Sequence, residues 1–150
     1  MPLNQAKKVI LDVLFDNAAT RLVGKYGEAI IADLIVVAEK NGNLAKTLDV
    51  VKGDTGIRWL EEGNSFSGWM HIVKKHITGE TAGGTKFPSS MNENQVKELV
   101  LQSIRDGSET ITFDSRGRKT FIYDYISPEG FNVKTIVGDN GYIVTSYPVY

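Results

Sequence analysis

The sequence of 150 residues contains no cysteine and only two histidines. The absence of cysteine excludes disulfides, a thiolate nucleophile and thiolate metal sites. The histidines do not stand in an HxxxH or HExxH spacing, so we expect no metal site and no cofactor. Neither sign of charge dominates, because the formal net charge is −1. Any binding of nucleic acid must therefore depend on a local basic patch.

Long apolar runs are also scarce. The segment AIIADLIVVA is interrupted by Asp33 and is too short to span a bilayer. The first residues, MPLNQAKKVILDVLF, lack the apolar region and cleavage site of a signal peptide, so we expect a soluble chain without stable membrane insertion. The composition, with 41% hydrophobic and 23% charged residues, is that of one globular domain with a sizeable core.

Hydrophobic periodicity predicts helices in the first part of the chain. Apolar residues recur at helical spacing in 9–14 and in 20–40, where Asn41-Gly42 ends the helix, and a short third helix ends at Gly53. GDTGIRW and EEGNSFSG are rich in turn-forming residues and predict connectors. A short helix then carries the histidines. A further helix at about 92–106 begins with Asn and Gln at capping-box spacing.

After Gly107 the apolar period changes from that of a helix to that of a strand. The segments ETITFD, KTFIYDYI, FNVKTIVG and YIVTSYP predict four strands joined by the turns SRGR, SPEG and DNG. This order predicts an α+β fold in which N-terminal helices pack on a twisted antiparallel sheet of four or more strands. We divide the chain into a helical segment, 1–56, and a second domain, 57–150. The helical segment is a delivery segment, a linker or part of the core.

The last predicted hairpin gathers three polar side chains. If Asn140-Gly141 form a two-residue type I′ turn, Lys134 lies opposite Tyr147. Moving the turn back by one residue still keeps Lys134, Thr145 and Tyr147 on one face, because side chains alternate with a period of two. A three-residue loop would break this arrangement. The sequence thus predicts an amine, a hydroxyl and a phenol on one sheet surface, although ordinary strand residues would give the same pattern.

Both histidines lie in the stretch GWMHIVKKHITG, residues 68–79. In an α-helix, at about 100° per residue, His76 lies on the apolar face and His71 lies on the polar face beside two lysines. The two cannot share a face if one α-helix runs unbroken through both. Gly79 predicts that the helix ends near His76, which could release this side chain into a cleft. Otherwise His76 is a core histidine and His71 a solvated one.

Four features follow one another in about residues 57–150: HI…KH, a glycine-rich loop running into TKFP, a helix, and strands ending in GYIVTSYPVY. In the order of these features the segment resembles bacterial EndoU-type RNases of the barnase–EndoU–colicin–RelE group. The last strand of that family commonly ends in a Ser/Thr-x-Tyr-Pro pattern, which IVTSYP matches. LVGKYGEAIIADLIVV is similar to the helical pretoxin stretches before such domains. Many members place the second catalytic histidine beyond the glycine-rich loop, and here none follows His76. Either His71 and His76 fill both roles, or the chain belongs to a neighbouring branch with one histidine.

The resemblance implies a metal-independent endoribonuclease that cleaves RNA, either tRNA or rRNA, by transesterification from the 2′-OH to a 2′,3′-cyclic phosphate. His71 and His76 would be general base and acid, since histidine has an ordinary pKa near 6.5 and serves both tasks. Lys134 would be the cation at the phosphate, and Thr145 and Tyr147 would contact the substrate. The further residues expected to bind RNA are Lys75, Lys86, Arg116, Arg118 and Ser146.

Many proteins of this group are C-terminal toxins of contact-dependent inhibition or other polymorphic toxin systems. The resemblance therefore implies a protein that is secreted or delivered from the producing cell and that acts in the cytoplasm of a target bacterium. It also implies a cognate immunity protein that neutralises the toxin in the producing cell. The alternative is a non-catalytic binding or interaction module of the same fold, in which both histidines are structural.

Overall fold

The computed structural model describes residues 20–150, and the helix predicted at 9–14 lies outside them. The elements in chain order are α2 (Thr20–Tyr26), α3 (Ile30–Glu39), the 3-10 turn η1 (Leu44–Lys46), β1 (Thr47–Gly53), β2 (Gly56–Glu61), α4 (Gly68–Ile72), the π-helical turn η2 (Val73–Ile77), α5 (Glu93–Asp106), β3 (Ser108–Phe113), β4 (Lys119–Ile126), β5 (Asn132–Val137) and β6 (Ile143–Val149).

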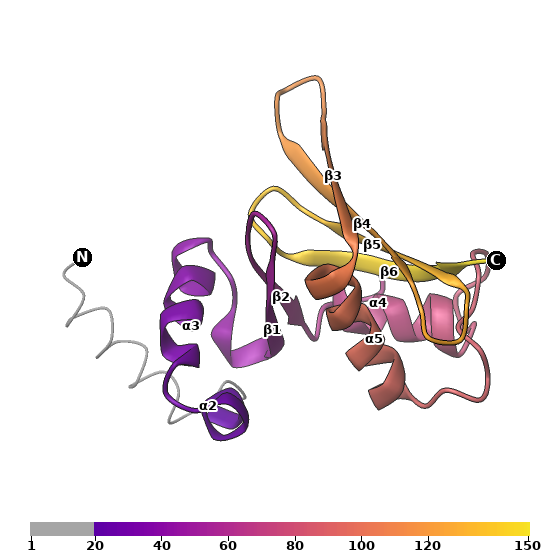
Figure 1. Cartoon of the computed structure of the whole chain (residues 1–150), viewed down its shortest axis with the longest axis horizontal. Coiled ribbons are helices and arrows are strands. Elements are labelled where there is room, and N and C mark those ends of the chain that lie inside the picture. Colours follow the sequence, from indigo (N-terminus) through magenta and orange to yellow (C-terminus); the bar gives the residue numbers. More distant parts are fainter. Residues whose placement is uncertain (1–19) are drawn as a thin grey trace.

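The fold is α+β, as the sequence predicts. Strands β3, β4, β5 and β6 form an antiparallel sheet in that order, and β1 pairs with β2 in a separate hairpin. Helices α4 and α5 lie on one side of the four-stranded sheet, while α2 and α3 lie beyond the hairpin (Figure 1). Within residues 20–150, none of the helices combines the length and the apolar character that a membrane crossing requires.

The helix predicted over 20–40 is divided in two. Between α2 and α3, Gly27 has a φ of 82°, a left-handed conformation that glycine adopts without the steric cost of a Cβ atom. The second helix ends just before Asn41-Gly42, as predicted, and Asn41 itself has a φ of 67°. The turn at Gly27 changes the chain direction, so α3 packs against β2.

Residues 47–61 form a hairpin, and the prediction of a short helix ending at Gly53 followed by a connector is wrong. The two strands pair from Thr47 with Glu61 to Gly53 with Gly56. The pairing crosses the position, between residues 56 and 57, at which the sequence was divided into two segments. Apolar and polar residues do not alternate along β1, because both of its faces are largely buried. A short apolar run of this kind cannot be told from a helix by periodicity.

The hairpin separates two apolar cores. Val50 and Trp59 pack with α2 and α3 in the smaller core, whereas Val51 and Leu60 pack with α4, α5 and the sheet in the larger one. Neighbouring residues of one strand therefore point into different cores, as the alternation of side chains requires. The N-terminal helices reach the rest of the molecule chiefly through this hairpin.

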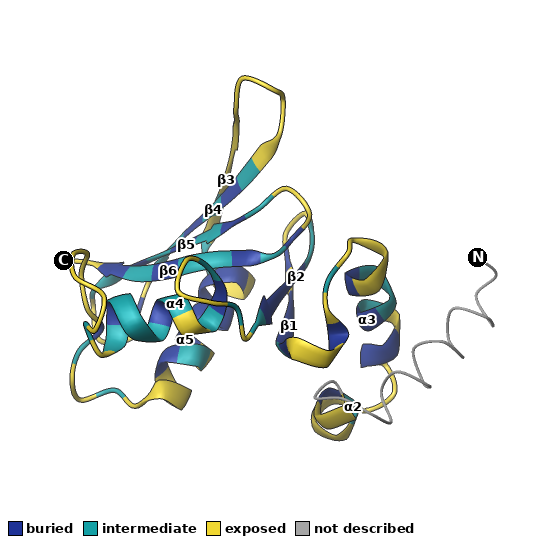
Figure 2. Ribbon diagram, turned by 180° about the vertical axis from the view of Figure 1, so that it is seen from behind, coloured by how far each residue is buried: buried dark blue, intermediate teal, exposed yellow. Residues whose placement is uncertain are grey.

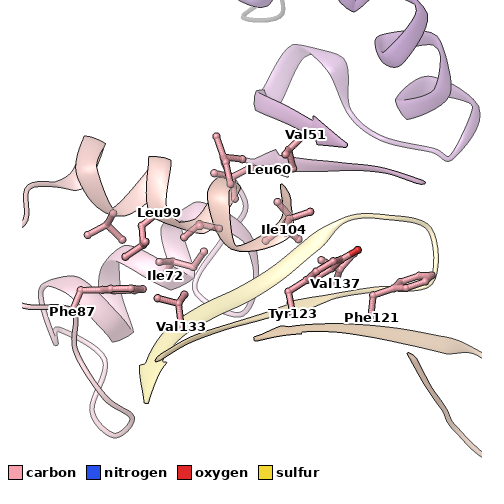
Figure 3. Close-up of a cluster of buried hydrophobic side chains, with 14 residues drawn as sticks. Val51, Leu60, Ile72, Phe87, Leu99, Ile104, Phe121, Tyr123, Val133 and Val137 are labelled. Carbon is pink, nitrogen blue, oxygen red and sulfur yellow. The ribbon is translucent and has the colours of Figure 1, made fainter. Parts of the chain in front are cut away.

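Helix α5 supplies the middle of the larger core (Figure 3). Its apolar stripe packs against β4 and β5, where Tyr123, Val133 and Val137 are fully buried. The predicted capping box is present: the Asn92 side chain accepts from the Gln95 N–H, and the Gln95 side chain accepts from the Asn92 N–H. The reciprocal bonds satisfy donors that would otherwise lack a partner at the start of the helix.

The last hairpin has the predicted strand pairing but a different turn. Gly138 and Tyr142 close a three-residue loop, in which the Gly138 N–H donates to the Tyr142 C=O at 2.9 Å and Gly141 has a φ of 109°. Such a loop would by itself shift every later side chain of β6 to the other face. A bulge in β6 near Val144 inserts one extra residue and reverses the shift. Lys134 consequently lies opposite Tyr147, as predicted.

Candidate active site

A π-helical turn brings the two histidines together. The Thr78 N–H donates to the Val73 C=O at 2.8 Å, a bond that spans five residues. A turn of this kind holds one residue more than an α-turn, so side chains five positions apart come to nearly the same side. The ring centroids of His71 and His76 lie 5.5 Å apart, with the ring planes at 77°. The conclusion that the two cannot share a face holds only for an unbroken α-helix, which this segment is not.

His76 is almost fully buried, with 4% of its surface exposed. Its Nδ1 lies 2.7 Å from the carbonyl oxygen of Thr85, and because a carbonyl only accepts, Nδ1 carries the proton. The Tyr147 ring stacks on the imidazole with centroids 5.4 Å apart. The other ring nitrogen, Nε2, has no hydrogen bond to residues 20–150. Every buried side-chain nitrogen or oxygen in that range has a hydrogen-bond partner, so an atom without one is not buried. Nε2 therefore reaches solvent.

Burial lowers the pKa of His76, and the nearby His71 and Lys75 lower it further, against the opposing hydrogen bond to Thr85. We expect the imidazole to titrate below its ordinary value near 6.5, so that it stays neutral at pH 7. Following the His76 ring proton by NMR during a pH titration measures this directly. Lys75→Gln removes a positive charge and should raise the pKa of His76. A wild-type value at or above 6.5 would contradict the lowered pKa.

His71 is held at both ring nitrogens. Nδ1 lies 3.0 Å from the carbonyl oxygen of Ser65, and Nε2 lies 2.9 Å from the Thr145 hydroxyl. In the neutral ring, Nδ1 donates to Ser65 and Nε2 accepts from Thr145, whereas in the protonated ring both nitrogens donate. The side chain is thereby clamped between the loop before α4 and strand β6.

The two imidazoles line a pocket of about 490 Å³. Thr145 and Tyr147 of β6 line it, together with Lys75, the glycine-rich loop and the last residues of the chain. The structure thus places four of the five predicted catalytic residues in one cavity. Within the described part of the chain, the side chains that line the pocket include an ammonium group and no aspartate or glutamate. This lining favours an anionic ligand.

Lys134 lies beside this pocket and does not line it. It projects from β5 opposite Tyr147, on the same sheet face, and its side chain is 35% exposed. The ammonium nitrogen lies 3.8 Å from a carboxylate oxygen of Asp124, which is too long for a hydrogen bond. A partly exposed pair of this length costs little to separate, so the lysine is available to an anionic ligand.

Two of the residues predicted to bind RNA lie far from the histidines. Arg116 and Arg118 stand in the β3–β4 turn, at the tip of a hairpin that projects away from α4 (Figure 1). The tip is exposed throughout (Figure 2). Arg118 pairs with Asp114 at 2.7 Å. Lys86, in contrast, follows the pocket residue Thr85 and is exposed at the rim.

Ser146 points away from the pocket, into the core. It is fully buried, and its hydroxyl lies 2.8 Å from the Thr135 hydroxyl, which in turn lies 2.7 Å from that of Ser103. Successive side chains of a strand point to opposite faces, and Ser146 lies between Thr145 and Tyr147, which both face the pocket. A substrate in the pocket does not meet this hydroxyl, and its prediction as an RNA-binding residue finds no support in the geometry.

The glycine-rich loop contacts both His76 and strand β6, which the sequence does not predict. The Thr85 carbonyl orients His76, and the Thr85 hydroxyl donates to the Pro148 carbonyl on β6. Gly84 has a φ of 75°, and a Cβ atom there would lie 3.0 Å from the His76 ring. The sequence signal for this contact is the pair of glycines before TKFP, which lets the loop approach the imidazole closely.

Within residues 20–150, no three histidine, aspartate or glutamate side chains gather where they could hold a metal ion. The resemblance to EndoU-type RNases rests on the order of the histidines, the glycine-rich loop and the closing IVTSYP, of which the histidines and Thr145 and Tyr147 meet in the pocket. No protein-family model matches this chain, and no curated protein matches it at a significant level.

Proposed function

We propose that this chain is an endoribonuclease that cleaves RNA, either tRNA or rRNA, by attack of the ribose 2′-OH on the adjacent phosphate. The observation that carries the proposal is the pair of imidazoles 5.5 Å apart, in a pocket that also holds Thr145 and Tyr147. The reaction needs one group that removes a proton and one that supplies a proton, and histidine performs both near neutral pH.

His76 is the general base. Its lowered pKa keeps it neutral, and its Nε2 is the ring atom that faces solvent without a partner. It takes the 2′-OH proton as the 2′ oxygen forms a bond to phosphorus. His71, in its protonated form, gives the Nε2 proton to the 5′ oxygen as the bond between phosphorus and that oxygen breaks. The products are a 2′,3′-cyclic phosphate and a 5′-OH.

The remaining pocket residues stabilise charge and hold the imidazoles. Lys134, opposite Tyr147, supplies the cation for the phosphorane, and Lys75, in the pocket wall, draws the phosphate in. The Thr145 hydroxyl holds Nε2 of His71 until the substrate replaces it. Tyr147 keeps the His76 ring in place by stacking.

Purified protein should cleave total tRNA or rRNA in the presence of EDTA, because imidazoles and lysines perform the tasks that a metal ion would otherwise perform. The products should end in a 2′,3′-cyclic phosphate, detected by its resistance to phosphatase until acid opens the ring. A matched oligonucleotide with a 2′-deoxyribose at the cleaved position is the control and should remain intact. Loss of activity in EDTA that one divalent metal restores, or cleavage of the 2′-deoxy control, would contradict the mechanism.

The biological role follows from the resemblance. We infer a toxin that is delivered from one bacterium into the cytoplasm of another and that is neutralised in the producing cell by an immunity protein. A pocket that opens at the surface is accessible both to RNA and to a protein that covers it.

A non-catalytic binding module remains the second candidate. One observation favours it: each imidazole bonds to a backbone carbonyl, Ser65 or Thr85, as purely structural histidines do. The two candidates differ in the cleavage assay, because a binding module retains RNA or a protein partner without producing cyclic phosphate ends.

A further inference from the structure

The turn before α4 presents a phenylalanine to solvent. Phe66 is 87% exposed, more than any other large hydrophobic side chain of residues 20–150. Its neighbours Ser65 and Ser67 are polar, Trp69 is half-buried, and Met70 in α4 is 42% exposed. The Phe66 ring therefore offers an apolar face to solvent beside polar neighbours.

Hydrogen bonds hold the turn in one shape. The Asn64 carboxamide oxygen accepts from the N–H of Phe66 at 2.8 Å and from that of Ser67 at 3.2 Å. The Asn64 N–H donates to the Ser67 carbonyl at 2.9 Å, and the Ser67 hydroxyl lies 3.0 Å from that of Tyr142. The backbone that carries the ring is therefore ordered before any ligand arrives.

Glycines at both ends allow this shape. Gly63 has a φ of 68° and Gly68 a φ of 81°. A Cβ atom on Gly63 would lie 2.1 Å from the Ser67 carbonyl oxygen, and one on Gly68 would lie 2.7 Å from the Tyr142 hydroxyl. The two ends of the turn are in direct contact, which restricts the position of Phe66.

The same turn orients a catalytic candidate. The Ser65 carbonyl accepts from Nδ1 of His71, and Phe66 is the next residue. The pocket lies at the other nitrogen of that ring, where Nε2 meets Thr145. Phe66 thus directly follows the residue that holds His71, and the other nitrogen of that ring bonds a residue of the pocket.

We propose that Phe66 stacks on an unpaired base of the RNA, at a nucleotide flanking the scissile phosphate. The inference rests on the proposed function and adds a binding subsite to it. Proteins bind single-stranded RNA by stacking bases on exposed aromatic rings, and every base has a face that can stack. Because the backbone of the turn is already ordered, binding of a base restricts only the Phe66 side chain, which favours affinity. This subsite selects single-stranded segments and not particular bases.

Phe66→Ala should weaken binding of a single-stranded oligonucleotide with 2′-deoxyribose at the cleaved position by about 5- to 100-fold, and raise KM similarly with kcat little changed. Phe66→Trp should retain wild-type affinity, whereas Phe66→Leu, apolar but not aromatic, should not. Phe113→Ala is the matched control, because Phe113 is 65% exposed at the far end of β3. Thermal melting confirms that each variant is folded.

An abasic site moved along the oligonucleotide then locates the contact. At one position the abasic substitution should weaken wild-type binding and leave the binding of Phe66→Ala unchanged. Equal affinities of wild type and Phe66→Ala, or equal losses in Phe113→Ala, would overturn the inference while cleavage by the wild type still supports the proposed function. A wild-type protein that does not cleave RNA contradicts the proposed function itself.

Discussion

His76→Ala should lose about 10²- to 10⁴-fold in the rate of RNA cleavage, the range expected for removal of one positioned acid–base group. The alanine variant also loses the hydrogen bond to Thr85 and the stacking on Tyr147. His76→Asn separates chemistry from structure, because its side-chain N–H can still donate to the Thr85 carbonyl but cannot take up a proton. Single-turnover cleavage and thermal melting of both variants provide the measurement.

His71→Asn is the companion variant, since it can still donate to the Ser65 carbonyl. If both histidines act, each asparagine variant loses activity while melting close to the wild type. Loss in His76→Asn alone would favour a mechanism with one histidine. Full activity in both asparagine variants would refute the acid–base assignment and favour the binding module with structural histidines.

Lys134→Ala should lower the single-turnover rate on the order of 10²-fold, if the ammonium group stabilises the developing charge on the phosphorane. Its stability should change little, because the pair with Asp124 is half-exposed and long. Lys134→Arg keeps the charge and should recover part of the rate. If Lys134→Ala keeps the wild-type turnover while Lys75→Ala loses much of it, then Lys75, and not Lys134, stabilises the charge on the phosphorane.

The neighbouring residue provides the structural control for this experiment. Thr135 faces the core and shares hydrogen bonds with Ser103 and Ser146. Thr135→Ala should therefore lower the free energy of unfolding by about 1–3 kcal/mol, because it leaves buried hydroxyls with fewer partners. The turnover of the folded fraction should remain close to that of the wild type. A loss of turnover without a loss of stability would contradict the assignment of Thr135 to the core face of β5 and of Lys134 to the opposite face.

Local sequence determined the elements whose signals do not depend on distant residues. Helix α5 has a capping box and an apolar stripe within its own residues. Strands β4 and β5 alternate because one face of the sheet is covered and the other is less so. The α+β fold follows from these signals alone. Lys134 does lie opposite Tyr147 as predicted, but only because a bulge in β6 offsets the three-residue loop.

Tertiary structure decided the features that depend on two-sided burial or on contacts between distant segments. Strand β1 is buried on one face by α2 and α3 and on the other by α4, α5 and the sheet, so its own residues do not show the period of a strand. The bulge that reverses the parity of β6 has no local pattern, since it compensates for a loop whose length the sequence leaves open.

The candidate site itself shows the same division. The resemblance to EndoU-type RNases pointed to His71, His76, Thr145 and Tyr147, but a regular α-helix would have turned the two imidazoles apart. The π-helical turn brings them together, and it is held by contacts that no short window contains: Thr145 on His71 and the Thr85 carbonyl on His76. A π-helical turn is rare, so the packing of distant segments around the two rings, and not the local sequence, accounts for this one.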